Sequence, residues 1–402
     1  MKLSNNKNAI LFLVDGLNPR FLSCYGCAWS ETPFFDRLAS ESILFERSIV
    51  ETNRPQIAVG ALLDSRHPLS LDDSANQGTR NQADHQIWNA LRSAGYDLRY
   101  ISDCNDSIEQ WGPRFDSVFR VGDSLLPNQL ANEIEETYLA SCVAELLQVL
   151  PTRTTPSLTV VHLRSLMSTW DAPLYLRSKH RDEEDPDPAQ MVVPPNGSSE
   201  IGPDEYLDNI HAYAAQLEVL DTCLSVLRHE LEQDGILQDS LFLLAGTCGF
   251  PLGDRGQVGQ TDGYLNGDAI HVPLFIRLPD GSESIPQRNQ HLNTQSDWMR
   301  WIQIWLADET QALDQIQGGR DYAFAKSEHT RSIWTDQWLL IYQRRFDEEA
   351  DFEMDPTVRL FVKPEDLWEV NPIEDRCREV VDELSATMDV VESTLAETQT
   401  QS

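Results

Sequence analysis

The chain has 402 residues, of which 41% are hydrophobic and 24% are charged, a composition typical of a globular protein with a sizeable core. Its formal net charge of −34 repels nucleic-acid phosphates and anionic membrane surfaces, so we expect neither as a partner. Its seven cysteines are typical of reduced thiols, and the one tight pair, Cys24 and Cys27 in a C-x-x-C, fits no zinc spacing and leaves a redox pair open.

No apolar run approaches the roughly 18 residues that cross a bilayer. The apolar stretch at residues 9–14 is shorter than the core of a signal peptide, and no small-residue cleavage site follows it. We therefore interpret this stretch as a buried strand and expect a cytoplasmic protein.

Strand and helix patterns alternate through the first three quarters of the chain. Continuous apolar runs predict buried strands at 9–15, 97–102, 157–163, 240–245 and 272–277. Amphipathic spacing predicts a helix that begins at Thr32 and Pro33, with Thr32 as its cap, and further helices at 85–94, 128–150, 206–231 and 297–306. This alternation predicts an α/β fold with a mostly parallel central sheet and helices on both of its faces.

The pattern changes in two places. Residues 179–203 are rich in acids, prolines and serines, which predicts a mobile loop. Short runs at 322–325, 332–335, 338–342 and 358–362 predict a small antiparallel sheet, and a helix follows at 374–388. We therefore expect an α/β domain over residues 1–315, a C-terminal subdomain over 316–388 and a disordered tail over 389–402.

Four segments, in chain order, resemble the sulfatase family of the alkaline-phosphatase superfamily. Residues 10–17, 24–26 and 32–39 are similar to the family's V-D-D, G-C-Y-G and T-P-N-L-D-R-L-A motifs, and residues 90–96 to its L-K-x-A-G-Y motif. Residues 236–249 and 271–274 are similar to its strand ending in S-D-H-G and to R-V-P-L. Residues 331–342 and, loosely, 360–384 are similar to its closing segments. The resemblance implies an alkaline-phosphatase-like fold in which strands 9–15 and 240–245 are neighbours that end at one site.

The resemblance also says which residues stand at the catalytic positions. Sulfatases use a cysteine that matures to formylglycine within C-x-P-S-R, and an ungapped count places Pro55 at the cysteine and Val59 at the arginine. A proline side chain has no nucleophile. None of the seven cysteines has a proline two residues later, so none fits the maturation motif.

The family's metal ligands are largely replaced. Sulfatases hold Ca²⁺ or Mg²⁺ with four Asp, Asn or His ligands, and the corresponding positions here are Asp15, Gly16, Thr247 and Cys248. Hard cations prefer charged oxygens and a thiol is a soft ligand, so Asp15 is the single suitable side chain. We expect no metal or other cofactor.

The cationic groups of the family's site are replaced as well. Asp103 and Asn105 stand where the resemblance places a lysine and a histidine, and Met167 stands at another histidine. An aspartate in place of a lysine inverts the charge that would face an anionic ester. The resemblance thus implies a sulfatase-like protein without ester hydrolysis, a pseudoenzyme that binds or scaffolds a protein or small-molecule partner.

Two other functions remain open from the sequence. The chain could be a sulfate or phosphate ester hydrolase with a rebuilt site, using Thr52 as the nucleophile or a metal at Asp15, Asp103, Asp254 and Asp262. It could also be a structural subunit of an active sulfatase. His162, on a predicted strand, is more typical of a hydrogen-bonded core histidine than of a catalytic base.

Overall fold

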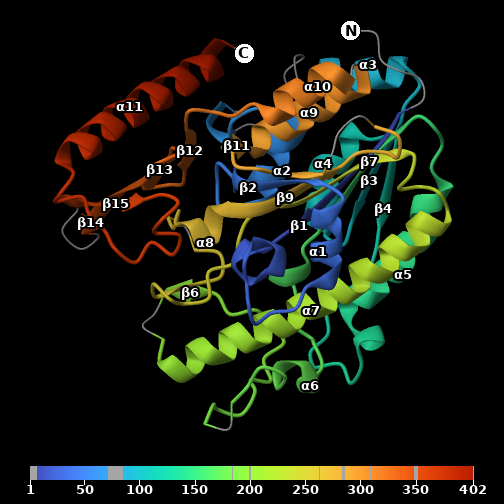
Figure 1. Cartoon of the computed structure of the whole chain (residues 1–402), viewed down its shortest axis with the longest axis horizontal. Helices are drawn as coiled ribbons and strands as arrows, with labels where there is room; N and C mark the ends of the chain where they lie inside the picture. Colours follow the sequence, from blue (N-terminus) through green and yellow to red (C-terminus); the bar gives the residue numbers. More distant parts are fainter. Residues whose placement is uncertain are drawn as a thin grey trace.

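The centre of the molecule is a nine-stranded sheet in a computed structural model that describes residues 7–70, 85–182, 184–198, 201–261, 263–282, 286–307, 309–347 and 352–401 (Figure 1). The strand order is β10-β2-β9-β7-β1-β5-β3-β4, and β11 pairs with β2. The strands are β1 (Asn8–Val14), β2 (Ile43–Ile49), β3 (Asp97–Ser102), β4 (Ser117–Arg120), β5 (Ser157–Leu163), β7 (Ser240–Gly246), β9 (His271–Arg277), β10 (Gln287–Asn289) and β11 (Asn293–Thr294). Only β9 is antiparallel to its neighbours, so the predicted α/β fold with a mostly parallel sheet is confirmed.

Strand β2 was not predicted, because polar residues interrupt its apolar pattern. Its register against β9 shifts between Phe45 and Ser48, and this irregularity leaves Glu46 and Arg47 half-buried. A bulge of this kind redirects side chains away from the regular alternation of a strand. The interruption that concealed the strand therefore positions two charged residues.

Helices cover both faces of the sheet. The face with Ile10, Phe12 and Val14 packs against α1 (Pro33–Ser40), α5 (Tyr138–Val149) and α7 (Pro203–Gln233). The face with Ala9, Leu11 and Leu13 packs against α2 (Pro55–Asp64), α3 (His85–Ser93), α9 (Gln295–Ala307) and α10 (Glu309–Gln317). The shorter helices are α4 (Asn105–Trp111), α6 (Leu174–Arg177) and α8 (Gly267–Ile270). Across the described ranges, no helix has the length and apolarity of a membrane span.

The helix predicted at 128–150 begins ten residues later than expected. Thr137 caps α5, accepting a hydrogen bond from the amide of Ala140 at 3.3 Å, and Asp171 accepts one from the amide of Tyr138 at 2.6 Å. These acceptors satisfy the first free amides of the helix and fix its start.

The C-terminal part forms a four-stranded antiparallel sheet of β12 (Ala323–Lys326), β13 (Thr330–Trp334), β14 (Trp338–Asp347) and β15 (Phe352–Val362). A small antiparallel sheet was predicted here. Helix α11 (Arg378–Gln401) packs on it through Leu384, Met388 and Val391. The tail predicted to be disordered at 389–402 is helical in the structure as far as Gln401, and its apolar residues Val391 and Leu395 pack at helical spacing. The mobility of 179–203 and the boundary near residue 315 stay predictions.

Helix α1 is capped by a residue distant in the sequence. Asp221 of α7 accepts hydrogen bonds from the amides of Phe34 at 3.0 Å and Phe35 at 3.2 Å. The predicted cap, Thr32, makes no capping bond, because its hydroxyl accepts a hydrogen bond from the amide of Ser23 at 3.0 Å instead. Burial raises the pKa of Asp221 to about 7.

We expect Asp221→Ala to lower the free energy of unfolding by about 2 kcal/mol, because two buried amides lose their acceptor. Asp221→Asn keeps an acceptor oxygen and removes a charge that burial disfavours, so at pH 8 its loss should be smaller. Urea unfolding measures both variants, with Asp321→Ala, at an exposed position, as the control. Equal losses in the alanine and asparagine variants would contradict this account of the cap.

Candidate functional site

The carboxyl ends of β1, β3, β5 and β7 meet at the centre of the sheet. Strands β1 and β7 are direct neighbours in parallel register, as the resemblance implied, with Val14 opposite Gly246. The amide of Thr247 donates to the carbonyl of Val14 at 3.0 Å. The first residues after these strands, Asp15 and Thr247, are therefore held side by side.

Asp15 is the centre of a buried hydrogen-bond network. Its Oδ1 lies 2.8 Å from Nε2 of His162 and also accepts a hydrogen bond from the hydroxyl of Thr247. On the other side of the imidazole, Nδ1 lies 2.8 Å from Oγ of Ser107 and 3.2 Å from the hydroxyl of Tyr100. All five residues are at most 3% exposed, so the network is closed to solvent.

The charges of this network determine the protonation of His162. Burial alone would lower the pKa of His162, but the contact with the Asp15 carboxylate outweighs it and raises the pKa. Asp103 lies at the same end of the sheet, where its Oδ1 accepts the amide of Arg164 at 2.9 Å. Burial raises the pKa of Asp103 as well.

Sulfur atoms and a glycine complete the centre. Sγ of Cys248 lies 3.2 Å from Sδ of Met167. A Cβ atom at Gly16 would lie 2.8 Å from Cγ of Met167, so the methionine fills the space that a side chain at position 16 would need. Gly16 also has a φ of +78°, which side chains rarely adopt. Burial raises the pKa of Cys248, which keeps its thiol protonated.

These residues do not fit the Ca²⁺ or Mg²⁺ that the family implies. Such a cation needs about six or more oxygen ligands. Here Asp15 is the single carboxylate at the strand ends of β1 and β7, and its Oδ1 already bonds His162 and Thr247. Within the described residues, no group of three or more His, Cys, Asp or Glu side chains could hold a metal ion.

Among the described hydrogen bonds, none joins the other positions expected from the resemblance to this network. Pro55 is the first residue of α2, and Val59 is buried in the core on the same helix. Thr52 is buried, and its hydroxyl accepts the amide of Arg54 at 3.3 Å. Asn105 begins α4 at the surface, where its Oδ1 accepts a hydrogen bond from Arg120 at 3.0 Å.

Within the described residues, the aspartates of the proposed four-aspartate site form no metal-binding group. Asp254 pairs with Arg20 at 2.6 Å, at the edge of a separate pocket. Asp262 lies outside the described residues. This alternative from the sequence analysis therefore has no support from the positions of the side chains.

Ser107, His162 and Asp15 lie in the order of a serine, histidine and acid relay. In such a relay, the hydroxyl must be open to a substrate carbonyl or ester. Ser107 is 0% exposed, and Tyr100 also bonds its hydroxyl at 2.6 Å. The arrangement therefore satisfies buried polar groups, and His162 is the hydrogen-bonded core histidine that the sequence predicted.

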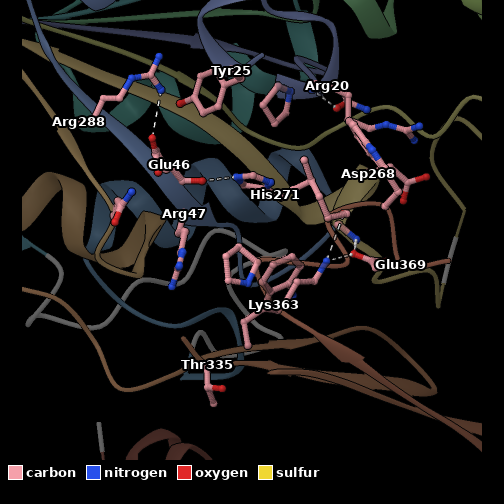
Figure 2. Close-up of a pocket in the computed structure, with 18 of the residues that line it drawn as sticks. Arg20, Tyr25, Glu46, Arg47, Asp268, His271, Arg288, Thr335, Lys363 and Glu369 are labelled. Carbon is pink, nitrogen blue, oxygen red and sulfur yellow. Dashed lines mark hydrogen bonds and ion pairs between the residues drawn. The ribbon is translucent and has the colours of Figure 1, made fainter. Parts of the chain in front are cut away.

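A separate pocket of about 340 Å³ lies between the main sheet and the C-terminal sheet (Figure 2). It was missed by the sequence analysis, because its walls come from distant segments with no shared motif. The walls include the loop after β1, the irregular part of β2, helix α8 and residues 363–369. None of the positions at which the resemblance places catalytic or metal-binding groups lines it.

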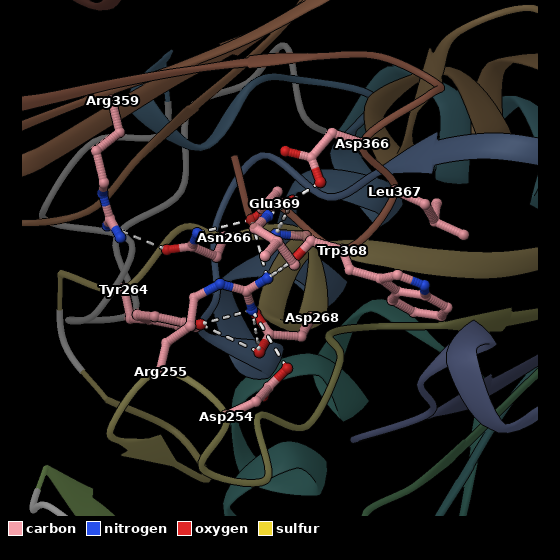
Figure 3. Close-up of polar contacts among 12 residues, drawn as sticks. Asp254, Arg255, Tyr264, Asn266, Asp268, Arg359, Asp366, Leu367, Trp368 and Glu369 are labelled. Carbon is pink, nitrogen blue, oxygen red and sulfur yellow. Dashed lines mark hydrogen bonds and ion pairs between the residues drawn. The ribbon is translucent and has the colours of Figure 1, made fainter. Parts of the chain in front are cut away.

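A polar network joins the two parts of the molecule beside this pocket (Figure 3). Glu369 accepts hydrogen bonds from Lys363 at 3.1 Å, from Asn266 at 2.6 Å and from the amide of Gly267 at 2.9 Å. Arg255 bonds Asp268 at 3.2 Å and the carbonyl of Trp368. Glu369 has a φ of +55°, an unfavourable conformation that these contacts hold in place.

The sequence model of the sulfatase family matches residues 7–306, so the chain belongs to the sulfatase family. No curated protein matches the sequence.

Several solved structures share the fold at low sequence identity. One is a phosphonate monoester hydrolase of Agrobacterium radiobacter, at 16% identity and a TM-score of 0.72, covering 98% of this chain and 96% of the other. Another was solved with its substrate D-glucosamine-2-N,6-O-disulfate, at 15% identity and a TM-score of 0.73, covering 98% of both chains. A third belongs to glycosaminoglycan metabolism in Bacteroides thetaiotaomicron, at 14% identity and a TM-score of 0.67, covering 97% and 100%.

We expect His162→Gln to destabilise the protein more at pH 5.5 than at pH 9. The raised pKa of His162 adds stability that is fully present below the unfolded pKa of about 6.5 and is lost as the pH rises through the folded pKa. Unfolding by urea at both pH values measures the difference between the variant and the native chain.

His271 provides the matched control, because burial lowers its pKa to about 4. The contribution of His271 to the free energy of unfolding should be smaller at pH 5.5 than at pH 9, by about 1 kcal/mol, which is the opposite of the change for His162. The reason is that at pH 5.5 the unfolded chain takes up a proton that the folded chain does not. The same pH dependence for His162→Gln and His271→Gln would contradict the assigned electrostatics.

Proposed function

We propose that this sulfatase-family protein does not hydrolyse sulfate esters and functions by binding a small-molecule or protein partner. The observation that carries the proposal is the closed network of Asp15, His162 and Thr247 at the strand ends. A hydrolase of this type needs a nucleophile and an electrophilic stabiliser that both reach the substrate. In this chain Pro55 stands at the nucleophile position, and Asp15 is occupied by two protein partners.

The surroundings of Asp15 support the same proposal. Ester cleavage builds negative charge on oxygen atoms, which cationic groups or a metal must stabilise. Met167 and Cys248 supply uncharged sulfur atoms, and Asp103 supplies another acid. The carboxylates of Asp15 and Asp103 would repel an anionic ester placed here, and Arg164, whose charge acts on Asp103 and Cys248, offsets part of this repulsion.

We expect no turnover of 4-nitrophenyl sulfate, 4-nitrophenyl phosphate or a phenylphosphonate monoester above the uncatalysed rate. The protein should be expressed with a formylglycine-generating enzyme, and intact mass should show no formylglycine, because no cysteine stands in the maturation motif. Turnover that survives repurification and disappears in Thr52→Ala, but not in the surface variant Thr387→Ala, would establish the rebuilt hydrolase instead.

We also expect a chelator to leave the melting temperature unchanged. A binding ion stabilises the folded state by mass action, whereas weak association with an acidic surface is screened like any other charge effect. Millimolar Ca²⁺ or Mg²⁺ should therefore shift the melting temperature no more than NaCl does at matched ionic strength. A saturable shift specific to one divalent ion, abolished by Asp15→Asn and retained in Asp321→Asn, would contradict the proposal.

A further inference from the structure

The pocket between the two sheets differs in charge from the rest of the molecule. Its lining contains five basic side chains and three acidic ones, whereas the whole chain carries a net charge of −34. The basic residues are Arg20, Arg47, Arg255, Arg288 and Lys363, and the acidic residues are Glu46, Asp268 and Glu369. Asp254 and Asp336, the partners of Arg20 and Arg47, bring the local sum of charges to zero, so this pocket repels an anion less than the rest of the acidic surface does.

The inner basic residues are engaged within the protein. Lys363 pairs with Glu369 at 3.1 Å, and Arg255 pairs with Asp268 at 3.2 Å. Lys363, Glu369 and Asp268 have side chains at most 4% exposed. These pairs form a fixed wall and are not available to a ligand. The charge of a ligand must therefore meet Arg47 and Arg288, which are called the outer arginines below.

The outer arginines keep donors that could bind a ligand. Arg47 bonds Asp336 through Nη1 at 3.0 Å, and the Asp336 side chain is 71% exposed. Arg288 bonds Glu46 through Nη1 at 3.1 Å and the carbonyl of Cys24 through Nη2 at 2.6 Å, and it is itself 54% exposed. A guanidinium group has five N–H donors, and exposed ion pairs of this kind contribute little, so exchanging a partner costs little.

The opposite side of the pocket is aromatic. Trp368 and Leu367 are 43% and 44% exposed, and Trp334 and Pro364 extend the apolar wall. The Arg20 guanidinium lies 4.4 Å from the centre of the Trp368 ring, which fixes that ring. Figure 2 shows Arg47 and Arg288 on one side of the pocket and Arg20 on the other. A bound molecule would therefore meet the positive charge of Arg47 and Arg288 at one end. At the other end it would meet the apolar wall, where the Arg20 guanidinium is stacked on the Trp368 ring.

We propose that this pocket binds a small organic monoanion, a carboxylate carried on an apolar body about the size of one aromatic ring. The carboxylate bonds Arg47, and the ring packs against Trp368 and Trp334. The volume of 340 Å³ is near the lower limit of ligand pockets, about 300 Å³, which favours a molecule of this size.

The charge and the donor geometry select among anions. The net charge of −34 repels a dianion more strongly than a monoanion, and the excess of basic over acidic lining residues is small. A planar guanidinium matches a planar carboxylate through two parallel hydrogen bonds. This inference names the ligand of the binding function proposed above and rests on it.

The test is calorimetric titration of the native protein with 3-phenylpropionate. We expect saturable binding at millimolar concentration or below, as is usual for a ligand with about ten heavy atoms. The neutral 3-phenylpropionamide should bind at least about tenfold more weakly, because it lacks the charge that the arginines bind. Phenyl phosphate should also bind more weakly than the carboxylate.

Two variants locate the binding site. Arg47→Gln and Trp368→Ala should each weaken binding of 3-phenylpropionate about tenfold. Their controls are Arg37→Gln and Trp29→Ala, at exposed residues outside the pocket, and these should bind as the native chain does. Circular dichroism establishes that each variant is folded.

Three outcomes would overturn the inference: no saturable binding by the native protein, equal affinity for the amide, or tighter binding of phenyl phosphate. None of the three needs a variant, so the test holds even if a substitution prevents folding. Turnover is measured separately with the ester substrates. A failure to bind with no turnover rejects this ligand alone, whereas ester turnover rejects the proposed loss of hydrolysis.

Discussion

The buried carboxylate of Asp15 is the constraint on which the strand-end site depends. An ionised carboxylate removed from water costs several kcal/mol unless it is paired and hydrogen-bonded. Its partners come from the strands on either side of β1, since His162 belongs to β5 and Thr247 follows β7. The register of the parallel sheet therefore supplies the compensation, and a one-residue slip would leave a charge unpaired in the core.

Once Asp15 is satisfied in this way, side chains pack closely around it. Met167 fills the space beside Gly16, and Cys248 contacts the same methionine. The turn that carries Met167 begins at Ser165 with a φ of +35°, so the backbone adopts an unfavourable conformation where the methionine enters. Opening the centre would require both this packing and the hydrogen bonds to be broken.

The sequence predicted the strands whose residues form continuous apolar runs, and the residues that follow directly after them. Strands β3 and β5 are buried on both faces, so their apolar runs defined their limits, and Asp15 and Thr247 could be placed because they follow such strands. Strand β2 was missed, because Glu46 and Arg47 interrupt its pattern where the register shifts.

The pocket could not be predicted, because no pattern links its segments before the chain folds. Arg20 and Trp368 are in contact although almost the whole chain separates them in the sequence. The start of α5 and the cap of α1 were misjudged for the same reason. Their acceptors, Asp171 and Asp221, are brought by other parts of the fold.

The strand-end site and the pocket between the two sheets differ in how many buried charges they contain. At the strand ends, carboxylates are few and each accepts hydrogen bonds. At the junction, four charged groups line the pocket: Lys363, Glu369, Arg255 and Asp268. Burial lowers the pKa of Lys363 and raises the pKa of Asp268 to about 7. Apolar residues of similar volume are often as stabilising as such an arrangement or more so. Stability alone therefore does not account for these charges. They hold Glu369 and the carbonyl of Trp368 in place, and with them the aromatic wall of the open pocket.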